Sequence, residues 1–130
     1  MKVSFDFDGT LSRKDVQGFA KELIIMGIDV WIVTSRTSTE DAKKKAWWWV
    51  EKQNDYLFEV ANECGIPKEK IVFTGQVEKV VYLTDRDFVF HLDDDEYELI
   101  QIMDSKISCV PLNVGHFEWK ESCLQLINKK

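Results

Sequence analysis

The fold of this chain is decided by the segment Val3-Ser4-Phe5-Asp6-Phe7-Asp8-Gly9-Thr10-Leu11. Apolar residues alternate along it as far as Phe7, which predicts a short β-strand that ends at the turn signal Asp8-Gly9-Thr10. Apolar residues then recur at helical spacing over 16–24, and a nearly continuous apolar run follows at 30–33. Such a run is typical of a strand buried on both faces of a parallel sheet. The segment therefore opens a strand–helix–strand unit.

The rest of the chain continues this alternation of strands and helices. A long helical stretch is predicted from Ser38 to Cys64, with a break near 53–55, and Gly65-Ile66-Pro67 closes it. The other predicted elements are strands at 71–73, 88–92 and 107–112 and helices at 78–83 and 117–127. This order predicts a single α/β domain over residues 1–130. We expect a Rossmann-like fold, in which helices flank both faces of a mostly parallel central sheet.

Composition narrows the class of protein. The chain has 130 residues, enough for one domain with one core. Its 17 Lys and Arg against 23 Asp and Glu give a formal charge of -6, which argues against a protein that binds nucleic-acid backbone over a broad surface. A small basic groove inside an acidic molecule is still compatible with this charge.

The sequence also predicts where the protein works. No apolar run approaches the roughly 18 to 20 residues of a membrane span, and the N-terminus lacks a signal-peptide pattern. The cysteines Cys64, Cys109 and Cys123 show no CxxC spacing, so we expect reduced, mostly buried thiols. We therefore expect a soluble, cytoplasmic protein with no membrane partner.

Polar side chains follow the predicted strands at the point where each strand ends. In order along the chain they are Asp6 and Asp8, then Thr34, Ser35 and Arg36, then Thr74, Gly75 and Lys79, and finally Asp93, Asp94 and Asp95. Ligands of open parallel sheets bind beyond the carboxyl ends of the strands, so these side chains are expected to converge. Carboxylates at this density need a cation, and hard oxygen ligands suit Mg²⁺. A hydroxyl and an ammonium nearby would hold phosphate oxygens, so the sequence predicts a Mg²⁺-assisted phosphate site.

The first of these segments has a familiar pattern. Phe5-Asp6-Phe7-Asp8-Gly9-Thr10-Leu11 resembles the DxDGT[L/V] signature of the haloacid dehalogenase superfamily of aspartate-nucleophile phosphatases. Val33-Thr34 is similar to the family's second motif, a lysine near a helix start to its third, and Leu92-Asp93-Asp94 to its fourth. The four elements occur in the family's order and cover residues 3 to about 96.

The resemblance implies a role for each matching residue. Asp6 would be the nucleophile that forms an aspartyl-phosphate, and Asp8 the general acid and base. Dehalogenase members of the superfamily lack the second aspartate, so Asp8 favours phosphoryl chemistry. The implied metal ligands are Asp6, Asp8 through its backbone carbonyl, Asp93 and Asp94. The implied phosphate-binding residues are Gly9, Thr34, Ser35 and Lys79.

Two of these assignments have alternatives within the sequence. Lys70 precedes the third predicted strand, whereas Lys79 follows it, so Lys79 is the expected lysine of the site and Lys70 the alternative. Asp93 is expected to bind metal directly, with Asp94 as a second or water-mediated ligand. Asp95 is also available in the same run.

The chain leaves no room for the cap domain that members of this family often carry. Only a few residues separate Asp8 from the first predicted helix, and four separate Thr74 from Lys79. An open site suits a phosphate on a large substrate, such as a nucleic-acid end, a protein or a lipid-linked sugar. A nucleic-acid end has no support from the net charge. Alternatively, a neighbouring subunit would supply the lid and allow small substrates.

The run Trp47-Trp48-Trp49 has three interpretations. Consecutive helical residues point in different directions, so one or two rings can enter the core beside Ala46 and Val50 and at least one should be exposed. Local packing is the first interpretation, a partner or homodimer face the second and base stacking the third. Lys43-Lys44-Lys45 is expected to be a solvated helix face, although it would also suit a nucleic-acid end.

Other residues and rival functions have simpler interpretations. His91 is expected to be a packed core histidine, and Arg36 either contacts substrate or lies exposed in its loop. A receiver domain is disfavoured because the third strand ends in Phe73-Thr74-Gly75 without an aspartate. The main alternative to a phosphatase is a catalytically silent protein that keeps the fold and the Mg²⁺ or phosphate site for binding.

Overall fold

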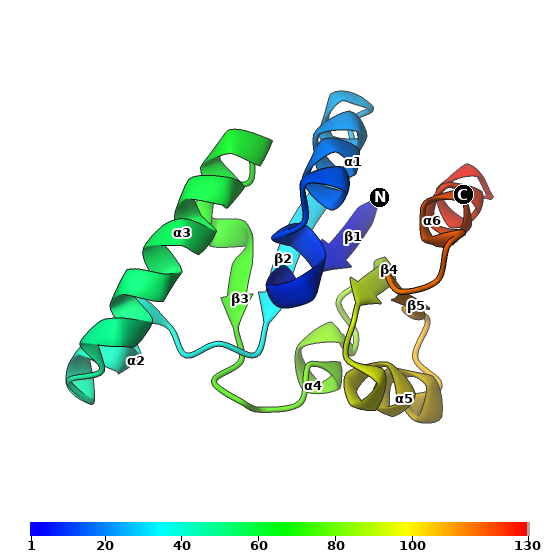
Figure 1. Ribbon diagram of the computed structural model, residues 1–130. Helices are drawn as coiled ribbons and strands as arrows, with labels where there is room; N and C mark the ends of the chain where they lie inside the picture. Colours follow the sequence, from blue (N-terminus) through cyan, green and yellow to red (C-terminus); the bar gives the residue numbers. More distant parts are fainter. Residues whose placement is uncertain (130) are drawn as a thin grey trace.

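Five parallel strands form the centre of the computed structural model, which describes residues 1–129 (Figure 1). The strands are β1 (Lys2–Phe5), β2 (Asp29–Thr34), β3 (Ile71–Phe73), β4 (Phe88–Asp93) and β5 (Val110–Asn113). They lie in the order β3-β2-β1-β4-β5, and every neighbouring pair is parallel. The predicted α/β fold with a mostly parallel sheet is therefore confirmed.

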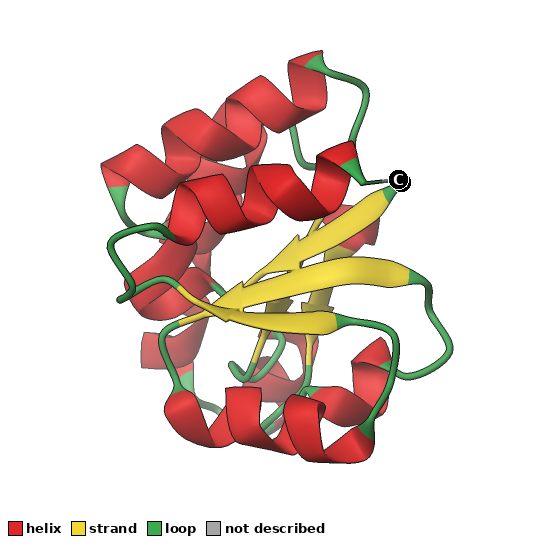
Figure 2. Cartoon of the chain, turned by 90° about the vertical axis from the view of Figure 1, so that its right-hand side faces the viewer, coloured by secondary structure: helices red, strands yellow, loops and turns green. Residues whose placement is uncertain are grey.

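Helices cover both faces of this sheet (Figure 2). They are α1 (Lys14–Ile25), α2 (Thr39–Lys44), α3 (Trp48–Cys64), α4 (Val80–Leu83), α5 (Glu96–Ser105) and α6 (Trp119–Asn128). Helices α1, α3 and α6 pack on one face, and α4 and α5 pack on the other. Among the described residues, no helix combines the length and apolarity needed to cross a membrane.

The core is divided between the two faces of the sheet. On the face covered by α1, the ring of Phe5 packs edge-on against Phe19 and Phe90, with centroids 6.3 and 5.9 Å away. On the other face, a smaller cluster forms around Val33 of β2 and Ile102 of α5. The thiols of the three cysteines are free and buried, as the sequence predicts.

The order of the strands creates a switch point beside β1. From β1 the chain moves outward through β2 and β3, then returns to the opposite side of β1 for β4 and β5. Loops leave in opposite directions from such a point, which opens a crevice at the carboxyl ends of the strands. Asp6 directly follows β1, and Asp93 is the last residue of β4. The fold therefore brings the first and last acidic segments to one place.

The first strand is shorter than predicted. It ends at Phe5, and Phe7–Leu11 forms a π-helical turn, η1, in which the Leu11 amide donates to the Asp6 carbonyl at 3.1 Å. Gly9 adopts φ +74°, a left-handed conformation that lets this wide turn close. Phe7 nevertheless stays fully buried, which is why its apolar character resembled a strand position.

The long predicted helix breaks at a different place. The prediction of a break near 53–55 is wrong, because α3 runs without interruption from Trp48 to Cys64. The break lies at Lys45–Trp47, where Ala46 adopts φ +56°. Asn54, a weak helix former, is tolerated inside α3 because its buried amide donates to the Thr37 carbonyl at 2.9 Å.

One helix between β4 and β5 was not predicted. Helix α5 begins after Asp95, whose carboxylate accepts from the backbone amides of Tyr97 and Glu98 at 3.0 and 3.4 Å. The strand predicted at 107–112 is displaced to Val110–Asn113, because the chain leaves α5 through Lys106 in a left-handed conformation. Pro111 fits β5 because this strand lies at the edge of the sheet.

Candidate active site

A buried lysine joins two carboxylates at the switch point. Lys79, which precedes α4, donates from Nζ to Asp6 Oδ1 at 2.8 Å and to Asp93 Oδ2 at 2.6 Å. The three side chains are 2%, 6% and 0% exposed. Lys70, the alternative lysine, lies elsewhere and pairs with Asp29 at 2.6 Å. The structure thus places Lys79 between the acidic segments, where the sequence predicts it.

Burial and charge set the protonation of this cluster. Burial raises the pKa of Asp6 to about 9, and the neighbouring charge of Asp93 adds to the effect. Burial alone would lower the pKa of Lys79, but the charges of Asp6 and Asp93 hold it above its ordinary value. Burial would also raise the pKa of Asp93, but His91 and Lys79 bring it below the usual range. Without a cation, Asp93 is therefore ionised, Lys79 is charged and Asp6 keeps its proton at neutral pH.

Asp94 completes a group that fits a divalent cation. One oxygen from each of Asp6, Asp93 and Asp94 lies within 4.8 Å of the others. Burial, and after it the charge of Asp93, raises the pKa of Asp6 and favours its protonated form, whereas a bound cation would favour the ionised form. Carboxylate oxygens are ligands of hard divalent cations, Ca²⁺ and Mg²⁺ alike. Asp95 lies outside this group because its carboxylate caps α5.

A second layer of buried polar residues holds Asp93. His91 Nε2 lies 2.8 Å from Asp93 Oδ2, and His91 Nδ1 lies 2.7 Å from Ser4 Oγ. Burial lowers the pKa of His91, so the ring is neutral. Because an ionised carboxylate only accepts, Nε2–H donates to Asp93 and Nδ1 accepts from the Ser4 hydroxyl. The prediction of a core histidine is correct about burial but missed this hydrogen bond.

Glu98 positions the lysine from the other side. Its carboxylate accepts from the backbone amide of Lys79 at 2.9 Å and so fixes the start of α4. Burial raises the pKa of Glu98, which is consistent with the position of its carboxylate between α5 and the backbone amide of Lys79. Sequence reasoning missed this residue because it missed α5. The signal was present, since Glu98 stands three residues after Asp95 in a helix-capping pattern.

Asp8 lies at the margin of the site and is held by Arg36. The guanidinium forms a two-pronged ion pair, with Nε 2.8 Å from Asp8 Oδ2 and Nη2 2.7 Å from Asp8 Oδ1. Arg36 Nη1 also donates to the Gln53 carbonyl at 2.9 Å, and the guanidinium carbon lies 4.9 Å from the centre of the Phe7 ring. The Asp8 side chain is 60% exposed. Of the two interpretations of Arg36, the structure thus excludes a free loop arginine.

The three remaining predicted residues are Gly9 in the turn η1, Thr34 at the end of β2 and Ser35 directly after it. A Cβ on Gly9 would overlap the carboxylate of Asp94, so these two segments are in close contact. Thr34 ends β2, fully buried, and its hydroxyl oxygen accepts from the Arg36 amide at 3.3 Å. Its own O–H has no acceptor among residues 1–129. The Ser35 carbonyl accepts from the backbone and side chain of Gln76, at 2.9 and 3.1 Å.

The site therefore combines a buried carboxyl nucleophile candidate, a buried ammonium, two further carboxylates and, at the rim, an exposed carboxylate paired with Arg36. Comparison with protein-family models, with curated proteins and with solved structures finds no match to this chain. The case for a function consequently comes from the chemistry of these residues.

Proposed function

We propose that this chain is a Mg²⁺-dependent phosphatase that hydrolyses a phosphomonoester through an aspartyl-phosphate on Asp6. The observation that carries the proposal is the buried Asp6–Lys79–Asp93 cluster, with Asp94 beside it, at the switch point of a parallel sheet. The resemblance of residues 5–11 to the signature of the haloacid dehalogenase superfamily agrees with it. The role proposed for each residue is the one that its matching motif implies.

Asp6 is the proposed nucleophile, once a bound cation has displaced the proton that it keeps in these surroundings. It would attack phosphorus, forming the new P–O bond while the bond to the leaving oxygen breaks, and water would then hydrolyse the acyl phosphate. Mg²⁺, when bound, would neutralise the carboxylates and polarise the phosphoryl oxygens. Lys79 remains beside Asp6 and would stabilise negative charge on the phosphoryl group. Thr34 would donate its O–H to the same oxygens and Ser35 its backbone amide, while Gly9, whose own amide donates to Ser12 Oγ at 3.1 Å, would permit the tight turn around the phosphate.

Asp8 is proposed as the acid and base of the two steps. It would protonate the leaving oxygen and later take the proton of the attacking water. In the structure its carboxylate is ion-paired with Arg36, so this role requires Asp8 to exchange that partner for substrate. Its exposed position at the rim leaves space for the movement.

The Arg36–Asp8 ion pair also supports a second candidate function. If Arg36 held Asp8 permanently, the protein would bind Mg²⁺ or a phosphate group without turnover. The chain would then be a catalytically silent binding protein. The two candidates differ in a single property, which is release of inorganic phosphate.

We also propose a class of substrate and a cellular compartment for this protein. Only the short turn η1 separates β1 from α1, and six residues separate β3 from α4, so the described chain holds no cap over the site. An open site suits a phosphate on a large molecule, or a small substrate covered by a second subunit. The free, buried thiols suit the reducing cytoplasm.

Phosphate release tests the proposal. Purified protein is incubated with an aryl phosphate, mononucleotides, sugar phosphates and phosphorylated oligonucleotides, in Mg²⁺ or in EDTA. We expect release from at least one substrate that EDTA and Asp6→Asn both abolish. Asp104→Asn, which changes an exposed aspartate of α5, is the matched control and should retain activity. Phosphate release that continues in EDTA would refute the metal assignment, and Mg²⁺ binding without any release would favour the silent binder.

A further inference from the structure

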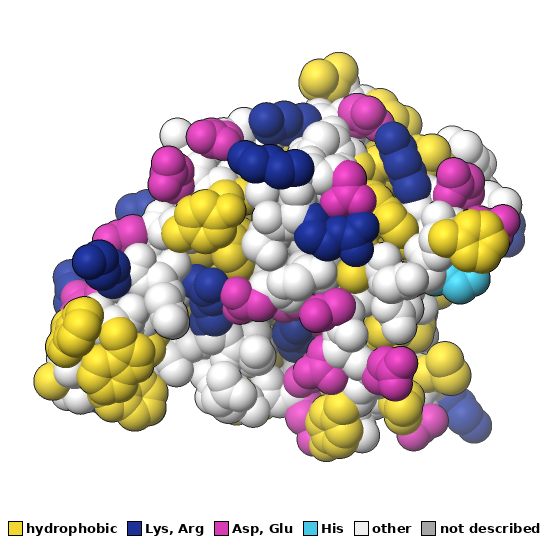
Figure 3. All heavy atoms as spheres, viewed as in Figure 1, with side chains coloured by type: hydrophobic (Ala, Val, Ile, Leu, Met, Phe, Trp, Pro, Cys, Tyr) yellow, Lys and Arg dark blue, Asp and Glu magenta, His cyan; other side chains and the backbone are white. Residues whose placement is uncertain are grey.

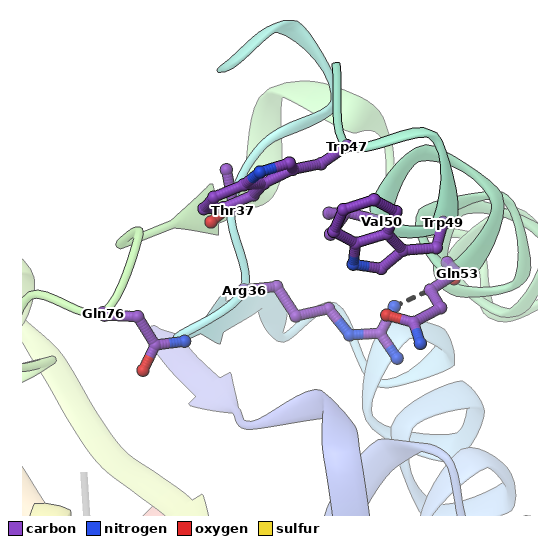
Figure 4. Close-up of a pocket in the computed structure, with 7 residues that line it drawn as sticks. All are labelled: Arg36, Thr37, Trp47, Trp49, Val50, Gln53 and Gln76. Carbon is purple, nitrogen blue, oxygen red and sulfur yellow. Dashed lines mark hydrogen bonds between the residues drawn. The ribbon is translucent and has the colours of Figure 1, made fainter. Parts of the chain in front are cut away.

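A pocket of about 310 Å³ includes Arg36, the partner of Asp8, among its lining residues (Figure 4). Its apolar side is formed by Trp47, Trp49 and Val50 at the start of α3. Its polar side is formed by Arg36 after β2, by Gln76 after β3 and by Gln53 of α3. The volume is at the low end of the range for small-molecule pockets, about 300 to 1,000 Å³, and suits a single flat ring system.

The chain break before α3 builds the aromatic side of this pocket. In a continuous helix two residues separated by one position point about 200° apart. Trp47 instead lies outside α3, directly after Ala46 with its left-handed φ of +56°. The Trp47 and Trp49 rings consequently lie on one side, with centroids 6.2 Å apart and planes at 27°. The expectation that at least one of the three tryptophans is exposed is confirmed by Trp48 and Trp49, and none of the three belongs to the core clusters, which one or two could have entered.

The two indoles of the pocket differ in exposure. Trp49 is 46% exposed and Trp47 is half-buried. Hydrophobic side chains gather over α2 and the start of α3 in the space-filling view (Figure 3). Lys45 Nζ lies 4.6 Å from the centre of the Trp47 ring, and Lys43 and Lys44 are exposed on α2. An aromatic surface bordered by ammonium groups is suited to a flat, negatively charged ligand.

Arg36 connects this pocket to the acidic site. Its side chain lines the pocket, and its guanidinium holds the Asp8 carboxylate. Gln76 has the same double position, because it lines the pocket and binds the carbonyl of Ser35, one residue after Thr34. A ligand that fills the pocket therefore contacts the two residues that border the candidate phosphate site.

We propose that the pocket binds the nucleobase of a nucleotide whose phosphate faces Asp6. This inference rests on the proposed phosphatase function and names its substrate class. The indoles of Trp47 and Trp49 stack on the base, as aromatic side chains do in single-strand binders. The amides of Gln53 and Gln76 offer a donor and an acceptor to the edge of the base. The nucleotide is a free monophosphate or the phosphorylated end of an oligonucleotide, for which the lysines of α2 would contact further phosphates.

Fluorescence titration in EDTA tests the pocket without turnover. Tryptophan emission is followed while an unphosphorylated nucleoside is added to the full chain. We expect saturable quenching that Trp47→Ala and Trp49→Ala each remove. Trp48→Ala is the matched control, because Trp48 belongs to the same run but does not line the pocket, and it should retain quenching. An unquenched wild-type protein, or equal quenching in all three variants, would overturn the inference.

Substrate selectivity provides the second test. The ratio of kcat/KM for a nucleoside monophosphate to that for glycerol phosphate should fall roughly 5- to 150-fold in Trp47→Ala, which is the usual effect of losing one stacking ring. Trp47→Phe should restore most of the ratio, and Trp48→Ala should not alter it. An unchanged ratio in Trp47→Ala and Trp49→Ala would overturn the inference even if phosphatase activity is high.

A third arm separates the two sources of the nucleobase. For a phosphorylated oligonucleotide, replacing Lys43 and Lys44 by Gln should reduce kcat/KM and its salt dependence, whereas a mononucleotide should be unaffected. If no substrate is turned over but the nucleoside quenches wild-type emission, the phosphatase proposal fails and the pocket stands. If a substrate is turned over but the nucleoside does not quench wild-type emission, the phosphatase proposal stands and the pocket fails. Concentration-dependent dimerisation through the tryptophans, without nucleoside binding, would replace the pocket by an oligomer contact.

Discussion

Replacing Asp6 by Asn should stabilise the metal-free protein, although it removes the proposed nucleophile. Burial and the charge of Asp93 raise the pKa of Asp6 from 3.8 to about 9. At neutral pH the folded chain therefore keeps a proton on Asp6 that the unfolded chain releases. Asn has the shape of the protonated carboxyl and can still accept from Lys79 through its oxygen. The substitution removes the cost of keeping that proton and preserves the hydrogen bond.

The size of the effect follows from the pKa of Asp6. One pH unit corresponds to about 1.4 kcal/mol, so holding the proton at pH 7 rather than releasing it near pH 3.8 costs at most about 4 kcal/mol. Rearrangement of the site reduces this figure, and we expect a gain of about 2 to 4 kcal/mol in Asp6→Asn. A group whose pKa is raised in the folded protein makes its full contribution to stability at any pH below its pKa in the unfolded chain. This contribution is lost as the pH rises towards the folded value, so the wild-type protein should lose stability between pH 3.8 and about 9.

Urea unfolding in EDTA, followed by far-UV circular dichroism, measures this effect. Wild-type stability should fall by up to about 1.4 kcal/mol for each pH unit from mildly acidic to mildly alkaline conditions, relative to Asp6→Asn. Saturating Mg²⁺ should stabilise the wild-type protein and leave Asp6→Asn nearly unchanged. Asp104→Asn controls for loss of an exposed charge and should behave as wild type. An Asp6→Asn protein that is less stable, or that shows the wild-type pH dependence, would refute the protonated state of Asp6.

Three further predictions concern the metal site and the acid. Mg²⁺ must displace the proton of Asp6, so at any pH below the pKa of Asp6 its apparent affinity should increase about tenfold for each unit by which the pH is raised. Calorimetry should also detect the release of close to one proton per ion. A Mg²⁺ affinity independent of pH would contradict this. Asp8→Asn should lower kcat by about 10² to 10⁴ while the circular dichroism spectrum stays unchanged, and near-normal rates would exclude its acid–base role. Gly9→Ala places a Cβ against Asp94 at φ +74°, so it should weaken Mg²⁺ binding in calorimetry and lower the unfolding free energy by about 1 to 2 kcal/mol, and wild-type values for both would disprove the close packing.

The architecture was predictable because the spacing of apolar residues along the sequence indicates which side chains are buried. The apolar run of β2 directly reflects a sheet covered on both faces, whereas the alternation at Val3 and Phe5 indicates a strand but not the burial of Ser4 between them. The position of the helix break was not predictable in this way. Gln53 and Asn54 are polar and favour a break, whereas the real break depends on a left-handed Ala46, a residue with no local preference for that conformation. Tertiary contacts of Asn54 override its propensity.

The site residues that directly follow strands were predictable from the sequence. The residues that hold those side chains in place were not predicted. Asp6, Lys79 and Asp93 stand at strand ends or a helix start, so topology alone brings them together. His91 could have been found too, because it stands two residues before Asp93 on the same face of β4. The pairing of Arg36 with Asp8 has no sequence signal, since it depends on how two loops fold over Phe7.

The most direct test of the central claim is to trap a phosphoryl group on Asp6. An aryl phosphate with a good leaving group needs little protonation to depart, so Asp8→Asn should still form the aspartyl-phosphate but lack the base that hydrolyses it. Rapid acid quenching in Mg²⁺, followed by peptide mass spectrometry, should locate one phosphoryl group on the peptide that contains Asp6. The label should be absent when Asp6→Asn is added to Asp8→Asn. Phosphate release by the wild-type protein with no label on Asp6, or with the label on another residue, would contradict the account.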